Sequence, residues 1–405
     1  MKKIQLLSIS LLVIFLFTGC ADMGSQTDPP KTDLFDTDAA LPGYDAQNKY
    51  FLADLSCFQE TDGFFCGSNC IGNYLQYYDK ATGITGVLCA DPACSHNSAE
   101  CGAYIKSGAT LSVYDGKLYW IANDAQGGSD HYLWQSDLSG TNRKKVKSLS
   151  FENVIMAYQP QRYVIHRGKL YMLGQASSVT GTQVGYRISI LSTSLDDSED
   201  ITVLYDNTID RGVQMATRCV GNAIYLSLVT FPEGGPFDVT IIKFDAKTGN
   251  SEVVYEESGM VAAPGAIWVT EQGEIYLPGA DVDHAYVWKV ENGVRTEIVC
   301  WDEANLSVPR IVDGIALTTY MNGGVKYIKM ASLNGEPYYD GELFPDGIPG
   351  LEGDPNQCGF AVIGGDEEKI IVNLQNFTET GLTDYTVMLD VTDNMKPTVL
   401  WSGQG

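Results

Sequence analysis

Three cysteines and one histidine stand close together in one short stretch of the chain, LCADPACSHNSAEC, from Leu88 to Cys101. The four side chains are Cys89, Cys94, His96 and Cys101. Thiolates and an imidazole suit four-coordinate zinc, and the Cys-x4-Cys spacing lies at the edge of the usual range. No HExxH-like pattern supplies a general base, so a zinc ion held here would be structural rather than catalytic.

The same cysteines are also candidates for disulfides. Three further cysteines precede them, Cys57, Cys66 and Cys70. Cysteines of exported proteins usually pair, and six of them can pair in many ways, among which the sequence does not choose. Zinc binding and disulfide formation would have the same structural consequence: either would cross-link the loop that follows the first structural repeat. Free thiols or redox use are a third alternative.

The first residues, MKKIQLLSISLLVIFLFTGC, have the features of an export signal: a basic pair, an apolar core and small residues before a cysteine. The last four resemble the bacterial lipobox, which implies that the signal peptide 1–19 is removed and that Cys20 is lipidated. Residues 20–49 are rich in Asp, Thr and Pro and are expected to form a flexible acidic tether. No second long apolar run follows, so we expect an extracytoplasmic protein at the cell surface, anchored to the membrane through the lipid on Cys20.

The chain is strongly acidic, with 51 Asp and Glu residues against 26 Lys and Arg residues and a formal net charge of −25. A body with this charge repels phosphate backbones, which argues against nucleic acid as a partner. The acidity is best explained by solubility in an exposed compartment.

A repeated unit indicates the architecture. A turn followed by a short aromatic or aliphatic strand recurs along the chain, as in DGKLYWIAN, RGKLYMLGQ and QGEIYLPGA. The second residue of the first six such turns is a glycine, at positions 63, 116, 168, 221, 273 and 314, with successive spacings of 53, 52, 53, 52 and 41. Each unit continues with alternating strands around Asn-Gly, Ser-Gly or Thr-Gly turns, which is typical of β-hairpins.

Seven units of four strands predict an all-β fold, a seven-bladed β-propeller of four-stranded antiparallel blades over residues 50–405. The strand-like segment from Tyr50 to Cys57 is expected either to begin the first blade or to close the ring by adding to the last one. Eight blades, or a division into two domains, are the competing layouts.

The hairpin that contains DLSGTNRKKV, residues 137–146, looks like the repeat of TolB-like propellers. The whole of residues 50–405 resembles a group of propeller lipoproteins of unknown function that are common in Gram-positive bacteria. In that group a Cys-x-x-Pro-x-Cys-x-His-like segment closes the first blade, and here this segment is CADPACSH, followed by Cys101. The resemblance implies the fold and the lipoprotein type, and it carries no assigned activity.

Catalytic motifs are not found: the chain has no G-x-S-x-G elbow, P-loop, dinucleotide-binding glycine pattern or EF-hand loop. Pairs of acidic residues occur at Asp196 with Asp197, Asp281 with Asp283 and Glu367 with Glu368, and we expect them to be solvated turns. The isolated Cys219, Cys300 and Cys358 are expected to pack in the core. His131, His166 and His284 form no cluster in the sequence.

Loops of varied length are the remaining candidates for function. Three of them, residues 123–132, 175–186 and 229–238, fall between the second and third strands of their blades and should share one face of the ring. We therefore expect a scaffold that binds an envelope protein, a peptide or a glycan. A carbohydrate-active enzyme, glycosidase or lyase-like, with acidic residues at the central channel is the alternative, and an architectural role in an envelope complex is a third possibility.

Overall fold

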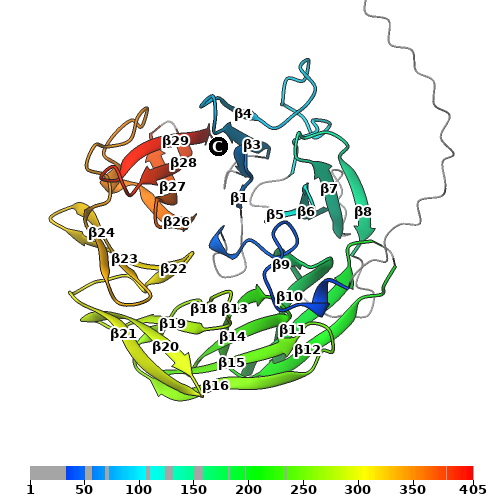
Figure 1. Cartoon of the computed structure of the whole chain (residues 1–405). Helices are drawn as coiled ribbons and strands as arrows, with labels where there is room; N and C mark the ends of the chain where they lie inside the picture. Colours follow the sequence, from blue (N-terminus) through cyan, green and yellow to red (C-terminus); the bar gives the residue numbers. More distant parts are fainter. Residues whose placement is uncertain are drawn as a thin grey trace, which may run out of the picture. The chain divides into compact units, whose positions relative to one another are not determined.

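The computed structural model describes residues 33–50, 57–68, 73–105, 110–123, 131–149, 158–180, 183–196, 198–232, 235–379 and 381–404. From residue 34 onwards the chain forms one compact unit. Seven antiparallel sheets follow one another around a ring, and each is built from strands that are consecutive in the sequence (Figure 1). The protein is a seven-bladed β-propeller, as the repeat predicts.

The first four blades each contain four strands, with the innermost strand named first. Blade 1 contains β1 (Phe58–Glu60), β2 (Phe64–Ser68), β3 (Leu75–Asp79) and β4 (Thr85–Val87). Blade 2 contains β5 (Leu111–Tyr114), β6 (Lys117–Asn123), β7 (His131–Asp137) and β8 (Lys144–Ser148). Blade 3 contains β9 (Tyr158–His166), β10 (Lys169–Thr180), β11 (Gln183–Ser194) and β12 (Thr202–Ile209). Blade 4 contains β13 (Gly212–Val220), β14 (Ala223–Phe231), β15 (Phe237–Asp245) and β16 (Ser251–Met260).

The last three blades repeat this plan, except that the innermost strand of blade 5 is divided in two. Blade 5 contains β17 (Ala263–Pro264), β18 (Trp268–Val269), β19 (Ile275–Ala280), β20 (His284–Glu291) and β21 (Val294–Asp302). Blade 6 contains β22 (Arg310–Val312), β23 (Ile315–Asn322), β24 (Val325–Ser332) and β25 (Pro337–Glu342). Blade 7 contains β26 (Gly359–Gly365), β27 (Lys369–Thr378), β28 (Gly381–Asp390) and β29 (Lys396–Gln404). Within the described residues the helices are three 3-10 turns, η1 (Leu34–Asp36), η2 (Asn48–Tyr50) and η3 (Pro355–Gln357).

The repeated glycines lie where the innermost strand turns into the second strand. Five of them, Gly116, Gly168, Gly221, Gly273 and Gly314, have φ angles between 55° and 85°. Glycine adopts this left-handed backbone without a steric penalty, which is why the tight turn recurs with this residue. The regular glycine spacing in the sequence is therefore the spacing of the blades.

The hydrophobic core is divided among the interfaces between neighbouring blades. Each of the seven interfaces has its own cluster of buried side chains from both blades, and the interface between blades 7 and 1 is included. Strands alternate their side chains between the two faces of a sheet, so each blade contributes to two of these clusters. This arrangement explains why alternating patterns run through every unit of the sequence.

Within the described residues, blades 7 and 1 meet by side-chain packing. In the described residues, blade 7 consists only of β26 to β29, and β1 begins at Phe58. The segment from Tyr50 to Cys57, expected to form a strand, lies largely outside the described residues: Tyr50 ends η2, and residues 51–56 are not described. Phe58 stacks on Trp401 of the last strand, with ring centroids 5.7 Å apart.

Residues 34–49 differ from the flexible tether that their composition predicts. Together with residue 50 they form a segment, here named the N-terminal strap (residues 34–50), which belongs to the same compact unit as the blades. The strap lies over the inner ends of the blades (Figure 1, dark blue). Residues 20–32, which contain Cys20, lie outside the described residues. No helix in the described part of the chain is long and apolar enough to cross a membrane.

Candidate functional site

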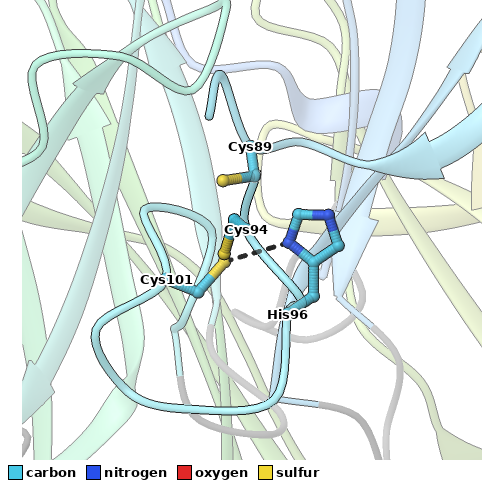
Figure 2. A group of neighbouring side chains, drawn as sticks. All are labelled: Cys89, Cys94, His96 and Cys101. Carbon is cyan, nitrogen blue, oxygen red and sulfur yellow. Dashed lines mark hydrogen bonds between the residues drawn. The ribbon is translucent and has the colours of Figure 1, made fainter. Parts of the chain in front are cut away.

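The cysteine-rich stretch brings all four of its candidate ligands together. The sulfurs of Cys89, Cys94 and Cys101 and a ring nitrogen of His96 all lie within 4.8 Å of one another. Figure 2 shows the four side chains gathered in one loop, with His96 Nδ1 directed at Cys101 Sγ, 3.4 Å away. The sequence predicts these four residues as one site, and the structure places them as one cluster.

Short turns shape the loop that carries these side chains. The Asp91 carboxylate accepts a hydrogen bond from the Ala93 N–H at 2.9 Å, and the Asp91 carbonyl accepts one from the Cys94 N–H at 3.1 Å. His96 has a φ of 52°, a left-handed conformation that few residues other than glycine adopt. The loop backbone is thus bent where His96 must turn toward the thiols.

The electrostatics of the three thiols differ. Burial, with the neighbouring thiols, raises the pKa of Cys101 to about 12. Burial also acts to raise the pKa of Cys89, but hydrogen bonds from the backbone N–H groups of Asp91 and Gly102 and from the other two thiols outweigh it, so its pKa is lowered. Cys89 therefore loses its proton before Cys101 does.

The other cysteines have mixed outcomes. Cys66 is fully buried, and burial raises the pKa of its thiol to about 12. Cys57 is half-buried, whereas Cys70 lies outside the described residues, so the predicted disulfides among these residues stay a prediction. Cys219 and Cys358 are buried, as expected, but Cys300 is exposed. On the outermost strand β21, Val299 is the residue that turns inward, and alternation places Cys300 on the opposite face.

The predicted acidic pairs do not converge. Asp281 Oδ1 accepts hydrogen bonds from the Asp283 and His284 N–H groups at 2.9 and 2.8 Å, which makes a turn in blade 5. Asp196 lies in a turn of blade 3, and Glu367 and Glu368 lie in a turn of blade 7. Asp197 lies outside the described residues. The described members lie in turns of three separate blades, and the carboxylates of Asp196 and Asp281 accept backbone hydrogen bonds there.

The three candidate loops do fall between second and third strands, at β6–β7, β10–β11 and β14–β15. The middle one is not a loop. Residues 175–180 and 183–186 continue β10 and β11 as a paired ribbon, with Thr180 opposite Gln183. The segment contains Val179, Val184 and Tyr186, and β-branched and aromatic residues favour strands over loops.

The N-terminal strap covers one mouth of the central channel. Its backbone and side chains contact five of the blades. The Gly43 and Tyr44 carbonyls accept hydrogen bonds from the Asp115 and Arg167 N–H groups. Gln47 and Asn48 donate side-chain hydrogen bonds to the carbonyls of Glu60 and Cys219, and Lys49 forms an ion pair with Asp366. The buried His166 accepts from the Ala46 N–H at 3.1 Å and donates to the Gly221 carbonyl at 2.8 Å. Burial lowers the pKa of His166, which keeps this imidazole neutral.

One carboxylate at the strap mouth, that of Glu60, is paired with lysines. A cavity of about 680 Å³ at this mouth is lined by strap residues and by turns between innermost and second strands. Glu60 lies 2.9 Å from Lys49 and 2.7 Å from Lys80. Glu60 is thus engaged by two lysines of the protein itself, and Asp62, Glu271 and Asp313 also line this cavity.

The opposite mouth contains a different cavity, of about 510 Å³. Gln214, near the start of β13, lines this cavity, whereas Val220, at the end of the same strand, lines the cavity at the strap mouth. Six residues of strand separate them by about 20 Å, so the two cavities lie at opposite ends of the channel. We name the cavity that contains Gln214 the open-mouth cavity.

Two arginines and no carboxylate line the open-mouth cavity, as far as the described residues show. Arg310 donates a hydrogen bond to the Val362 carbonyl, and no described carboxylate lies within 4.0 Å of it. Burial lowers the pKa of Arg310, although a guanidinium stays charged in a protein. Arg218 stacks over the Trp268 ring, 5.8 Å from its centroid. Sequence reasoning did not single out these arginines, which stand 92 positions apart and meet only through ring closure.

These features define the protein as a β-propeller with a covered mouth, an open mouth and a thiol-rich cluster between two blades. No family model and no curated protein matches the chain.

Solved structures do match, at low sequence identity. A prolyl endopeptidase is 14% identical over 88% of this chain and 50% of its own, with a TM-score of 0.51. The β-propeller domain of the trilobed protease from Pyrococcus furiosus is 13% identical over 87% of this chain and 98% of its own, with a TM-score of 0.43. TolB from Acinetobacter baumannii is 13% identical over 71% and 65%, with a TM-score of 0.36.

These likenesses concern the fold. TolB and other β-propeller domains are among the structural neighbours. The chain spans about half the length of the prolyl endopeptidase that it matches.

Proposed function

We propose that this protein is an extracytoplasmic binding propeller, anchored to the membrane by a lipid on Cys20, that holds its ligand in the open-mouth cavity. The anchor is supported by the signal-like segment 1–19 and the lipobox-like residues that end at Cys20. The binding function is supported by the rigid ring and by the difference between its two mouths.

One observation carries the proposal: the two mouths differ in whether their basic side chains have carboxylate partners within the protein. At the strap mouth, Lys49 and Lys80 are neutralised by Glu60. In the open-mouth cavity, Arg310 has no described carboxylate partner, although the protein carries an excess of acidic residues. Arg310 is half-buried, and a guanidinium withdrawn from water is costly unless an anion compensates it. An anion supplied by a ligand would restore that balance.

The lining indicates the kind of ligand. Beside the arginines, the open-mouth cavity contains apolar side chains, among them Pro264, Val308, Pro309 and Phe360. A volume of about 510 Å³ is of the size that binds a small ligand or a peptide end. Arginine recognises carboxylates through paired hydrogen bonds. We therefore propose a peptide with an apolar end and a free terminal carboxylate.

The alternative of a carbohydrate-active enzyme has less support. It needs carboxylates that converge at the channel, one as an acid and one as a base or nucleophile. The described lining of the open-mouth cavity contains none. At the strap mouth Glu60 is held by lysines, although Asp62, Glu271 and Asp313 also line that cavity.

The test is a binding measurement on the full chain in detergent. The probe is an equimolar pool of acetylated tripeptides with free carboxylates, and the matched control is the same pool with amidated ends. We expect the free acids alone to raise the melting temperature. Arg310→Gln should weaken the binding by about 10- to 100-fold, because a charge-assisted hydrogen bond is lost.

Arg187→Gln is the matched control, since Arg187 is an exposed arginine paired with Asp206 far from this cavity. If Arg310→Gln does not fold, Ser307→Trp tests the same site by filling its exposed rim. Equal binding of acids and amides, or unchanged binding by Arg310→Gln, would contradict the proposal. Binding of polygalacturonate in place of the peptides would make the ligand a glycan and overturn the peptide assignment.

A further inference from the structure

The cysteine-rich loop, residues 88–105, joins the outermost strand of blade 1 to the innermost strand of blade 2. It contains no strand of its own in the described residues, and one isolated bridge joins Tyr74 to Tyr104. Main-chain hydrogen bonds from Leu75 N to Ala103 O and from Ile105 N to Asn73 O fix its far end. A loop with so little regular structure needs another source of rigidity.

We propose that Cys89, Cys94, His96 and Cys101 bind one zinc ion, which fastens this loop across blades 1 and 2. The geometry is the first argument. Zinc–sulfur bonds of about 2.3 Å and zinc–nitrogen bonds of about 2.0 Å place tetrahedral ligand atoms about 3.5–3.8 Å apart. The separation of 3.4 Å between His96 Nδ1 and Cys101 Sγ is close to this value, and the whole set lies within 4.8 Å (Figure 2).

The number of ligands is the second argument. A disulfide joins two sulfurs, so any pairing within the cluster leaves one thiol and His96 without a role. In the structure all three cysteines are thiols. A single metal ion uses all four side chains, and three sulfurs with one nitrogen form a donor set that suits zinc. Four protein ligands also close the coordination sphere, which makes the ion structural.

The surroundings of the sulfurs are the third argument. The backbone passes close to the Cys89 sulfur, because Gly102 has no side chain and a methyl group there would lie 4.0 Å from Cys89 Sγ. The left-handed backbone at His96 holds the imidazole beside Cys101.

The cluster is connected to both blades. Cys101 packs in the core between blades 1 and 2 with Leu75 of one blade and Trp120 of the other. Arg143 of blade 2 donates to the Cys101 carbonyl at 3.1 Å and lies over the Trp134 ring at 4.5 Å. A zinc ion that orders this loop therefore orders the contact between the two blades.

Zinc is tested by native mass spectrometry and elemental analysis of the full chain in detergent, purified without chelators. We expect about one zinc ion per chain, with the three cysteine thiols protected from alkylation until the metal is removed. Chelation should lower the melting temperature, and zinc should restore it. Cobalt should replace zinc and give the visible absorption of a tetrahedral thiolate site.

Variants of His96 separate a ligand from a packing residue. His96→Ala should weaken zinc binding by at least about 100-fold, since even the loss of a partner of a ligand costs about 10- to 100-fold. His96→Cys should retain zinc, because a four-sulfur site is equally suited to it. Cys300→Ser, which removes an exposed thiol on β21, is the control and should change nothing.

Two results would overturn the proposal. One is metal-free protein in which two of the three thiols resist alkylation until a reductant is added, since this identifies a disulfide. The other is metal-free protein with all three thiols reactive and no effect of added zinc on the melting temperature. Zinc that persists in His96→Ala with unchanged affinity would also exclude His96 as a ligand.

Discussion

Arg167 is the residue on which the N-terminal strap depends most. This arginine is buried, and its guanidinium donates hydrogen bonds to the carbonyls of Leu34, Thr37 and Ala39 and to the carboxylate of Asp45. It also donates to the side chain of Asn222 in blade 4. One side chain thus joins separate parts of the strap to two blades, and the planar fork of arginine suits this role better than lysine.

Arg167→Met should destabilise the protein by about 3–5 kcal/mol, because it leaves buried acceptors and Asp45 without their donor. The strap should become the first segment cut by a protease, since its attachment to the turns is lost. Chemical denaturation and limited proteolysis of the full chain measure both effects.

Arg187→Met, which breaks the exposed pair with Asp206, is the matched control and should cost at most about 1 kcal/mol. If the two variants had the same stability and the strap stayed resistant to proteolysis, Arg167 would not be its anchor.

Among the strands, the contact between β29 of blade 7 and blade 1 closes the ring. Phe58 and Phe65 of blade 1 pack with Ile371, Leu400 and Trp401 of blade 7. Gly67 of β2 permits this approach, because a methyl group there would lie 2.6 Å from the Trp401 ring and 2.8 Å from the Cys57 carbonyl. Lys49 of the strap adds ion pairs to Glu60 of blade 1 and Asp366 of blade 7.

Gly67→Ala should cost about 1–3 kcal/mol by overpacking this interface. Trp401→Phe, made by itself, should also destabilise the protein. The double variant should lose less stability than the two single variants lose together, because the smaller ring makes room for the methyl group. Thermal and chemical denaturation measure the coupling. Gly63→Ala, in open space in the same blade, is the control. Strict additivity would show that Gly67 and Trp401 are not in contact.

The sequence predicts the strands and the turns between them well. Alternating side chains and glycine turns repeat with nearly constant spacing, because each blade must bury two faces and turn sharply at its inner end. The ribbon at residues 175–186 was harder to predict, since a polar hairpin and a loop have similar composition. The contacts that close the ring could not be predicted from the sequence either, because Gly67 and Trp401 are far apart in the chain and only the tertiary fold brings them together.

The whole molecule determines where its sites lie. The cluster of three cysteines and one histidine could be predicted because its four residues lie within one short loop. The open-mouth cavity could not, because Arg218 and Arg310 belong to blades 4 and 6 and become neighbours only in the closed ring. The strap was missed because residues 34–49 have the composition of a linker, and their order comes from long-range contacts such as those of Arg167 and His166.

The measurement that tests the central claim most directly is site-specific photo-crosslinking in intact cells. A photoreactive residue at position 307 probes the open mouth, and one at position 272 probes the strap mouth. We predict a crosslinked peptide adduct from position 307 only, in the membrane fraction, lost with Arg310→Gln and moved to the soluble fraction with Cys20→Ser. No adduct from position 307, or equal adducts from both positions that persist in Arg310→Gln, would contradict a membrane-anchored propeller that binds through its open mouth.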